Sequence, residues 1–341
     1  MSVNEAKDAA AGASPAGALR RSDGSPLLST EFGLLILLIL FCVGFAGLTK
    51  GFLSPFNLFA LTRTGAVNVL VGLSMMTVIV TGGLDLSIGA TGASAGMFAA
   101  WLMQDLGFPA PLGVLGGLGL GVALGAVNGE LVVRSGMHSF IVTLATMSIF
   151  FGAMIVLTHA EPFNGLPAGF VDLGHIRWWG MASPMLLVAF AAAVGLQVLY
   201  RYTSIGREML AAGANPKAAL LSGVDVGRAI VLCHVAAGLL AAIAGLLLTI
   251  RNSAAIPAMV GSLGQDWLLP GFLGPVLGGA LLSGGRVSVL GAVLGALLVT
   301  VLNSGLLLMH VGEFWVQFFL GLLLLGAVTI DKARRQLILG H

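Results

Sequence analysis

The side chains that could do chemistry in this sequence are few and lie at the ends of its apolar runs. Three carboxylates, Asp85, Glu130 and Asp266, are the candidates for coupling to protons or ions. Such coupling usually needs an ionisable group in the middle of a membrane span, and these three lie near predicted helix ends. An intramembrane enzyme would need a nucleophile and a base, or a metal cluster, within the apolar runs, and we find neither. The ionisable residues therefore favour neither catalysis nor ion coupling.

Two other kinds of site are missing as well. The six histidines are scattered and none has a metal-ligand spacing such as HExxH, so no metal site is expected. The sequence also has no GxxxxGK[ST] phosphate loop, and none of its four lysines follows a glycine. If ATP drives this protein, another chain must bind the nucleotide.

Composition places the chain in a membrane. Of its 341 residues, 57% are hydrophobic and only 9% are charged, and its mean hydropathy is +1.02. Soluble domains carry about 25% charged residues, and disorder needs low hydrophobicity. The apolar runs are too long for the strands of a barrel, so we expect an all-α polytopic membrane protein. The net charge of +2 has no clustered basic face, which argues against nucleic-acid binding.

Ten apolar windows predict about ten transmembrane helices: 32–48, 65–81, 86–103, 112–133, 139–158, 183–200, 229–250, 267–283, 287–309 and 313–330. With both termini in the cytoplasm, twelve of the sixteen Lys and Arg residues lie inside and four outside, as the positive-inside rule expects. We therefore predict a mobile cytoplasmic tail over 1–31, a transmembrane domain over 32–330 and a basic cytoplasmic tail over 331–341. The longest cytoplasmic loop is 201–228 and the longest outer loop is 159–182. The turns at 82–85 and 284–286 are very short, and each could be re-entrant. Cys42 and Cys233 lie within apolar runs and are expected to be small buried hydrophobes.

The long cytoplasmic loop predicts a docking surface for another protein. Residues 205–212 and 214–221 suit two short helices, separated by Gly213, Asn215 and Pro216. The alanines of the loop give it a small-residue surface that suits close docking. They are Ala211, Ala212, Ala218 and Ala219.

Glycines mark turns and close helix packing elsewhere. Gly82 and Gly83 end one helix, and Asp85 or Ser87 can cap the next. Asp85 falls at the predicted cytoplasmic edge, where it need not be buried, and its alternative role is a gate. Five glycines recur every fourth residue and predict a helix face that a neighbour approaches closely: Gly113, Gly117, Gly121, Gly125 and Gly129. Gly291 and Gly295 predict the same in a later helix.

Four of these segments resemble the permease subunits of ribose-type carbohydrate ABC importers, and they occur in that family's order. The first is Gly82-Gly83-Leu84-Asp85-Leu86-Ser87-Ile88-Gly89, and the second is Asn128-Gly129 followed by 140–147. The third is the cytoplasmic loop, with Gly206, Ala211, Gly213, Asn215, Ala218, Ala219, Ser222 and Gly223. The fourth is Leu277-Gly278-Gly279 with Gly284-Gly285-Arg286 behind it. The chain differs at 269–275, where Pro270 and Pro275 should kink or shorten the helix.

The resemblance implies a non-catalytic subunit of the bacterial inner membrane that imports a monosaccharide or related polyol. Its partners would be an ABC ATPase that binds ATP and Mg, a periplasmic substrate-binding protein, a second permease copy or paralogue, and membrane lipid. The residues expected to couple to the ATPase are Gly206, Arg207, Ala211, Gly213, Asn215, Ala218, Ala219 and Gly223. Those of a gate or hairpin are Gly82, Gly83, Asp85, Ser87, Gly278 and Gly279. Candidates for the substrate path are Asn68, Thr77, Phe140, Thr143 and Asn303, and for docking of the binding protein Glu161, Asp172 and Arg177. An ion-coupled secondary transporter and a branched-chain amino-acid-type ABC permease remain as alternatives.

Overall fold

A computed structural model describes the chain from residue 30 to residue 339. Over this range the regular elements are helices, and the only β-type pairings are isolated bridges. The helices are α2 (Thr30–Leu48), α3 (Pro55–Ile79), α4 (Ile88–Gln104), α5 (Ala110–Ser135), α6 (Ser139–Leu157), α7 (Ala168–Val171), η2 (Asp172–Gly174), α8 (Met185–Tyr202), α9 (Ser204–Ala214), α10 (Pro216–Leu221), α11 (Val226–Asn252), η3 (Ser262–Trp267), α12 (Leu268–Leu277), α13 (Val289–Leu308) and α14 (Glu313–Leu339). The predicted all-α class is confirmed for this part of the chain.

Seven of the described helices are long and apolar enough to cross a membrane: α2, α3, α5, α6, α8, α11 and α13. The other three predicted windows fall on α4, with 17 residues, on α12, with 10, and on the apolar start of α14. The predicted helix over 267–283 is wrong in its second half, because α12 ends at Leu277. Pro275 lies inside this helix, and Gly279, with a φ of +81°, follows its end in the left-handed conformation that commonly terminates helices.

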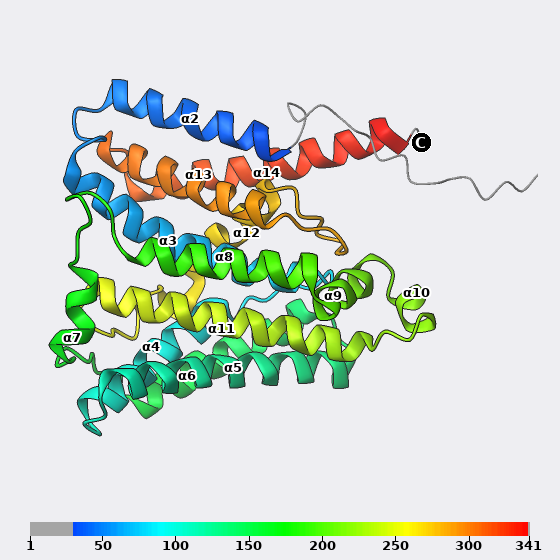
Figure 1. Ribbon diagram of the computed structural model, residues 1–341, viewed down its shortest axis with the longest axis horizontal. Helices are drawn as coiled ribbons and strands as arrows, with labels where there is room; N and C mark the ends of the chain where they lie inside the picture. The colour runs from blue at the N-terminus through cyan, green and yellow to red at the C-terminus, as the bar shows by residue number, and fades with distance from the viewer. Residues whose placement is uncertain (1–29, 340–341) are drawn as a thin grey trace, which may run out of the picture.

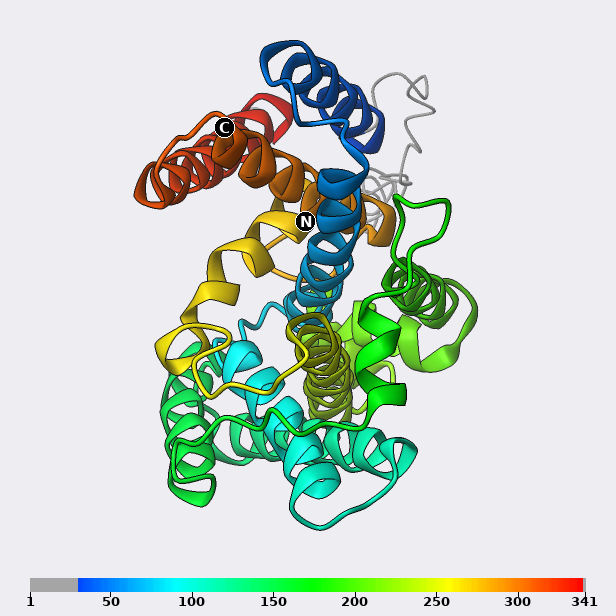
Figure 2. The ribbon, with the colours of Figure 1, turned by 90° about the vertical axis from the view of Figure 1, so that its left-hand side faces the viewer.

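The long helices run side by side, with α3 and α11 in the middle of the bundle (Figures 1 and 2). The helices α4, α5 and α6 pack on one side of this pair, and α2, α13 and α14 lie on the other. Most of α3 and α11 is buried within the chain, whereas α2, α5 and α8 expose most of their surface. The exposed faces are apolar, as expected for helices that contact lipid or a second membrane chain.

The glycine ridge of α5 packs as predicted. A methyl group added at Gly125 would overlap the carbonyl oxygen of His234 in α11, and one at Gly129 would lie 2.7 Å from the Cα of Val231. Helix α11 also contributes a glycine to this contact, Gly238, which lies against the backbone of Gly121. Backbones that approach this closely gain van der Waals contact, which drives helix association in a membrane. Gly121, Gly125 and Gly129 therefore hold α5 against α11, while Gly113 and Gly117 face α4.

Polar residues cap the helices of the loop 201–228. Thr203 caps α9 by accepting the N–H of Gly206 at 3.1 Å, and Asn215 caps α10 by accepting the N–H of Ala218 at 3.1 Å. The two predicted short helices are confirmed, but the break is at Asn215 alone and Gly213 lies inside α9.

The start of α2 and the end of α14 lie at the same end of the molecule as α9 and α10 (Figure 1). Helix α14 continues to Leu339, so it includes most of the predicted basic tail 331–341. Of the predicted N-terminal tail, 1–29 lies outside the described residues.

Candidate functional site

Helix α9 lies directly against two glycine-containing connections. The first glycine segment, residues 80–87, joins α3 to α4, and the second glycine segment, residues 278–288, joins α12 to α13. The two connections are bonded to each other, because the N–H of Gly285 donates to the carbonyl oxygen of Val80 at 2.8 Å. A methyl group added at Gly213 would overlap that same oxygen and lie 2.7 Å from the Gly285 nitrogen. Three motifs that are far apart in the sequence therefore meet through backbone atoms.

Both glycine segments are longer than the turns at 82–85 and 284–286 that the sequence suggested, and neither is a simple hairpin. Gly82, Gly284 and Gly285 have φ values of +77°, +86° and +80°, a backbone conformation that side chains rarely allow. A methyl group at Gly284 would lie 2.6 Å from the Gly82 nitrogen. Only glycine permits the two segments to touch in this way.

Asp85 is buried, with 3% of its surface exposed, so the expectation that it need not be buried is wrong. Its Oδ1 atom accepts the N–H of Ser87 at 2.8 Å and the Ser87 hydroxyl at 2.7 Å. The Ser87 hydroxyl in turn accepts from Nδ2 of Asn128, 2.7 Å away in α5. Ser87 is the N-cap residue of α4, but its side chain makes no cap bond. Asp85 instead stabilises the start of the helix by accepting the N–H of Ser87. The carboxylate thus ties the first glycine segment to α5.

The first glycine segment is also tied to α6. The N–H of Leu84 donates to the Ser139 hydroxyl at 2.8 Å, and the N–H of Leu86 donates to the Thr143 hydroxyl at 3.1 Å. The Thr143 hydroxyl lies 3.2 Å from the carbonyl oxygen of Leu84 and 2.8 Å from that of Ser139. A displacement of the segment is therefore passed to the first turns of α6. Thr143 was predicted for the substrate path, and Ser139 was not singled out because one serine at a helix start carries no distinct signal.

The predicted coupling residues divide between two faces of the loop. Gly206, Gly213 and Ala219 are buried, whereas Arg207, Asn215, Ala218 and Gly223 are exposed and Ala211 is intermediate. Ala212, another alanine of the loop, is also buried. The alanines consequently do not form one exposed surface, as the sequence suggested. The most exposed apolar side chains of α10 are instead Leu220 and Leu221, at 66% and 89%. These two leucines give the loop an apolar tip.

One histidine lies at the heart of this end of the bundle. His234 in α11 is fully buried, and its Nδ1 atom lies 3.0 Å from the carbonyl oxygen of Ile230. Its Nε2 atom has no hydrogen-bond partner among the described residues. His234 lines a small cavity of about 120 Å³ together with Thr81 and Ser139, so it faces the first glycine segment. Sequence analysis did not single out this position, because His234 is a single histidine within an apolar run.

Two of the predicted substrate-path residues belong to one polar region between α3 and α13. Nδ2 of Asn68 donates to the Thr300 hydroxyl at 2.9 Å. Thr300 and Asn303 line a cavity of about 280 Å³, which also contains Asn57 and Ser304. The Ser304 hydroxyl donates to Oδ1 of Asn57 at 3.1 Å. Amides and hydroxyls around one cavity provide the hydrogen-bonding groups that a hydroxylated solute needs.

The other predicted path residues lie elsewhere. Thr77 is fully buried between α3 and α11, where its hydroxyl donates to the carbonyl oxygen of Ser74. Phe140 stands on α6 with 42% of its surface exposed. The five residues therefore do not line a single cavity within one chain.

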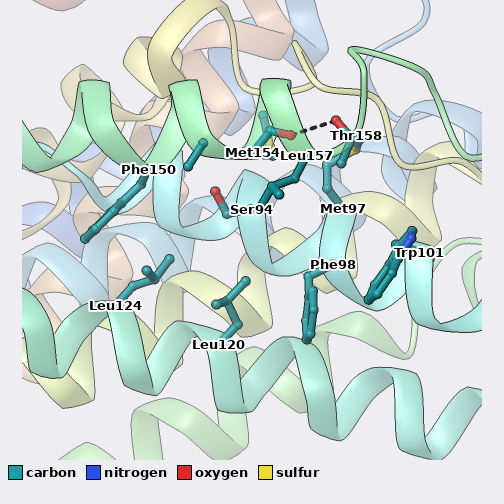
Figure 3. A pocket seen from close by; sticks show the side chains of 11 residues that line it. Ser94, Met97, Phe98, Trp101, Leu120, Leu124, Phe150, Met154, Leu157 and Thr158 are labelled. Carbon is teal, nitrogen blue, oxygen red and sulfur yellow. Dashed lines mark hydrogen bonds between the residues drawn. The ribbon is translucent and has the colours of Figure 1, made fainter.

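A further cavity, of about 340 Å³, lies between α4, α5 and α6 (Figure 3). Its walls are mainly aromatic, aliphatic and methionine side chains, among them Phe98, Trp101 and Phe150. The Thr158 hydroxyl there is already bonded to the carbonyl oxygen of Met154, at 2.8 Å. Ser94 supplies the only hydroxyl in the lining without a hydrogen-bond partner among the described residues. This cavity suits an apolar group better than a solute with several hydroxyls.

Three arginines gather at the opposite end of the bundle from α9. The guanidinium carbons of Arg63 and Arg177 lie 5.3 and 4.6 Å from the centre of the Phe59 ring. Arg63 donates to the carbonyl oxygen of Arg251. The guanidinium group of Arg251 in turn donates through Nη1 to the Thr64 hydroxyl at 3.2 Å. Among the side chains that the structure describes, the one ion pair is Arg134–Glu130 on α5, so none of their carboxylates pairs with these cations. The group can therefore take an acidic partner.

Neither metal nor disulfide chemistry is indicated by the described part of the chain. It contains no group of three or more His, Cys, Asp or Glu residues arranged to hold a metal ion. Cys42 and Cys233 are free; Cys233 is buried as expected, whereas Cys42 is only partly buried.

Comparison with known proteins assigns the family. Residues 57–328 match the family described as "Branched-chain amino acid transport system / permease component". The chain belongs to this permease family. It is 38% identical to the ribose import permease protein RbsC of Bacillus subtilis over 309 residues, which cover 90% of this chain and 93% of the relative. It is 31% identical to the D-allose transport system permease protein AlsC of Escherichia coli, with 89% and 91% covered. It is 32% identical to the fructose import permease protein FrcC of Rhizobium meliloti, with 87% and 84% covered.

No solved structure matches the chain significantly. The family and the seven apolar helices identify this permease as a multi-pass protein of the inner membrane. The resemblance seen in the sequence motifs is thereby confirmed, and the α9 contact with the two glycine segments becomes a candidate for the coupling site of a transport permease.

Proposed function

We propose that the chain is the membrane subunit of an ABC importer that carries a monosaccharide or a related polyol. The relatives named for ribose, allose and fructose import support the substrate class. The observation that carries most weight is the contact of α9 with both glycine segments, since it links an exposed loop to the ends of four membrane helices. ATP and Mg²⁺ would be bound by a separate ATPase, because the sequence has no phosphate loop.

In this proposal the ATPase binds the loop 201–228 and moves α9. The exposed tip of α10, with Leu220 and Leu221, supplies apolar contact area, and Arg207 supplies a charge on an exposed face. Because Gly213 touches Val80 and Gly285 through backbone atoms, no flexible side chain lies between them to absorb the motion. The movement therefore reaches both glycine segments together.

From the first glycine segment the motion continues into α6. The bonds of Leu84 and Leu86 to Ser139 and Thr143 connect the two elements. Helix α6 presents a broad apolar face, with Ile141 and Ile149 at 55% and 61% exposure. We propose that a second permease copy or paralogue covers part of this face and that the solute passes between the two chains.

The orientation follows from the basic residues. The end that carries α9, the start of α2 and the end of α14 would be cytoplasmic, and ten helical passes would connect the two sides. The arginine group with Arg63, Arg177 and Arg251 then faces the periplasm. Acidic residues of a substrate-binding protein would pair with it, and the loop residues Glu161 and Asp172 would add contacts of the opposite sign.

Two other functions remain to be tested. An ion-coupled secondary transporter would need an ionisable group at mid-membrane, and the buried Asp85 lies at the end of the bundle beside α9. A permease for branched-chain amino acids is suggested by the family description. Its substrate carries two opposite charges, whereas the cavity of Asn303 is lined by amides, hydroxyls and apolar groups.

The test is purification from native membranes in mild detergent, with mass spectrometry of the subunits that stay bound. The captured complex is then placed in vesicles, and uptake of labelled ribose, allose, fructose and leucine is measured with and without ATP. A stoichiometric ATP-binding subunit and ATP-dependent sugar uptake are expected. Uptake by the chain alone, without ATP, would overturn the importer, and leucine uptake would favour the amino-acid permease.

A further inference from the structure

A polar cavity opens beside the coupling helix, at the level where α8 ends. It has a volume of about 490 Å³ and lies between the end of α8, the start of α2 and the second glycine segment. Six of its lining side chains carry charge or hydrogen-bonding groups, and they come from three different elements: Glu31, Gln197, Tyr200, Arg201, Arg286 and Ser288. A cavity with this lining differs from the apolar surfaces that α2 and α8 expose elsewhere.

Neither arginine of the cavity forms an ion pair with a described carboxylate, although Glu31 lines the same cavity. A guanidinium group binds phosphate in a bidentate way and is the preferred side chain for that purpose. Basic pockets between membrane helices on the cytoplasmic side bind phospholipid head groups for this reason. Two guanidinium groups around one cavity therefore favour a phosphate ligand.

The carboxylate of Glu31 adds a second requirement. Its Oε1 atom accepts the Ser288 hydroxyl at 3.0 Å, which ties the start of α2 to the second glycine segment. Glu31 also lines the same cavity as the arginines. A purely anionic ligand would be repelled by this carboxylate, whereas an ammonium group on the ligand would pair with it.

Apolar side chains continue from the cavity along the membrane helix. Val198 and Val194 stand one and two turns before Arg201 on α8, and each exposes 45% of its surface. Leu290, which lines the cavity, is 59% exposed at the start of α13. Acyl chains could lie along these residues while the polar group occupies the cavity.

We propose that this cavity binds the head group of an amine-bearing phospholipid, with Arg201 and Arg286 on the phosphate and Glu31 on the ammonium. This inference rests on the chain spanning a membrane and not on which solute it carries. The bound lipid would join α8, α2 and the second glycine segment at the place where α9 packs, since Leu210 of α9 also lines the cavity. Membrane composition would then affect how firmly the coupling elements are held together.

The test uses the purified full chain in detergent with equal amounts of phosphatidylethanolamine, phosphatidylglycerol and phosphatidylcholine. Native mass spectrometry counts the lipid that stays bound. We expect phosphatidylethanolamine to be retained in preference to the other two. Arg201→Gln and Arg286→Gln should each weaken retention about fivefold, the effect of roughly one surface arginine. Glu31→Gln should remove the preference over phosphatidylglycerol, and the matched control Arg134→Gln, at the same end of the bundle, should change nothing.

Three results would overturn the proposal. The first is equal retention by the Arg201→Gln/Arg286→Gln double variant and the unaltered chain. The second is a preference of the unaltered chain for phosphatidylglycerol, which would exclude the ammonium partner. The third is displacement of the lipid by free O-phosphoethanolamine at the same concentration, which would identify a soluble phosphate as the ligand. The last two measurements need no variant, so they hold even if an arginine substitution impairs folding.

Discussion

Replacing Gly213 with alanine tests whether α9 must touch both glycine segments through backbone atoms. The added methyl group would overlap the carbonyl oxygen of Val80 and lie 2.7 Å from the nitrogen of Gly285. Van der Waals contact needs about 3.5 Å, so α9 must move away by at least about 1 Å. Both obstructing atoms belong to the backbone, and neither can rotate aside. The close contact between α9 and the two segments is therefore lost or strained.

Overpacking of this kind costs about 1–3 kcal/mol. Because 1.4 kcal/mol corresponds to a factor of ten, the docked arrangement of α9 becomes about 5- to 150-fold less populated. The assay is sugar uptake into vesicles that contain the complete complex, together with the amount of ATP hydrolysed. We expect uptake for each ATP hydrolysed to fall by roughly tenfold or more.

Gly195→Ala is the matched control, because a methyl group at this exposed position of α8 meets nothing within 4 Å. Both substitutions lie inside a helix, so both gain the same higher helix propensity of alanine, about 1 kcal/mol. Any difference between them comes from the contact that Gly213 makes. If Gly213→Ala transports as well as Gly195→Ala, the close approach is not needed and the proposed coupling path is wrong.

Three further predictions address neighbouring parts of the molecule. Thr143→Val removes the hydroxyl that joins α6 to the first glycine segment, so sugar uptake should fall several-fold, whereas Thr143→Ser should keep normal uptake. Equal uptake by the unaltered chain and both variants would show that α6 is not part of the proposed coupling path. Asp85→Asn replaces a buried carboxylate that accepts two hydrogen bonds from Ser87, so the free energy of unfolding should fall by about 1–3 kcal/mol. Thermal unfolding in detergent measures this, and an unchanged midpoint temperature would contradict it. Arg63→Gln should weaken affinity for the binding protein several-fold at low salt and less at high salt, as measured by surface plasmon resonance, and the same loss at every salt concentration would rule out a charge contact.

Local chemistry explains what the sequence could predict. The break at Asn215 was visible because an asparagine caps a helix and a proline follows at its first position. The ridge on α5 was visible because five glycines at a spacing of four must share one helix face. Both features depend on residues within one or two turns of each other.

The features that sequence analysis missed depend on contacts between distant residues. Gly213 was taken as a helix break, yet it is a helical residue kept small by Val80 and Gly285, which are more than seventy residues away on either side. Asp85 was placed at a solvated edge, but α5 and the first glycine segment enclose it. The pattern of polar and apolar residues along one helix does not show which segment, distant in the sequence, will pack against a given residue.

The shortness of α12 has a consequence for hydrogen exchange. Ten residues of helix rise about 15 Å, half the thickness of a hydrocarbon core of about 30 Å. If α12 belongs to one of the ten proposed passes, backbone outside this helix must complete the passage, and lipid cannot satisfy its amide groups. Residues 253–267 and the second glycine segment flank α12 on its two sides, so in that arrangement they would face protein or water rather than acyl chains. Where they face water, their amide hydrogens would exchange with solvent far faster than those of α11, and this flank of the bundle would be wet.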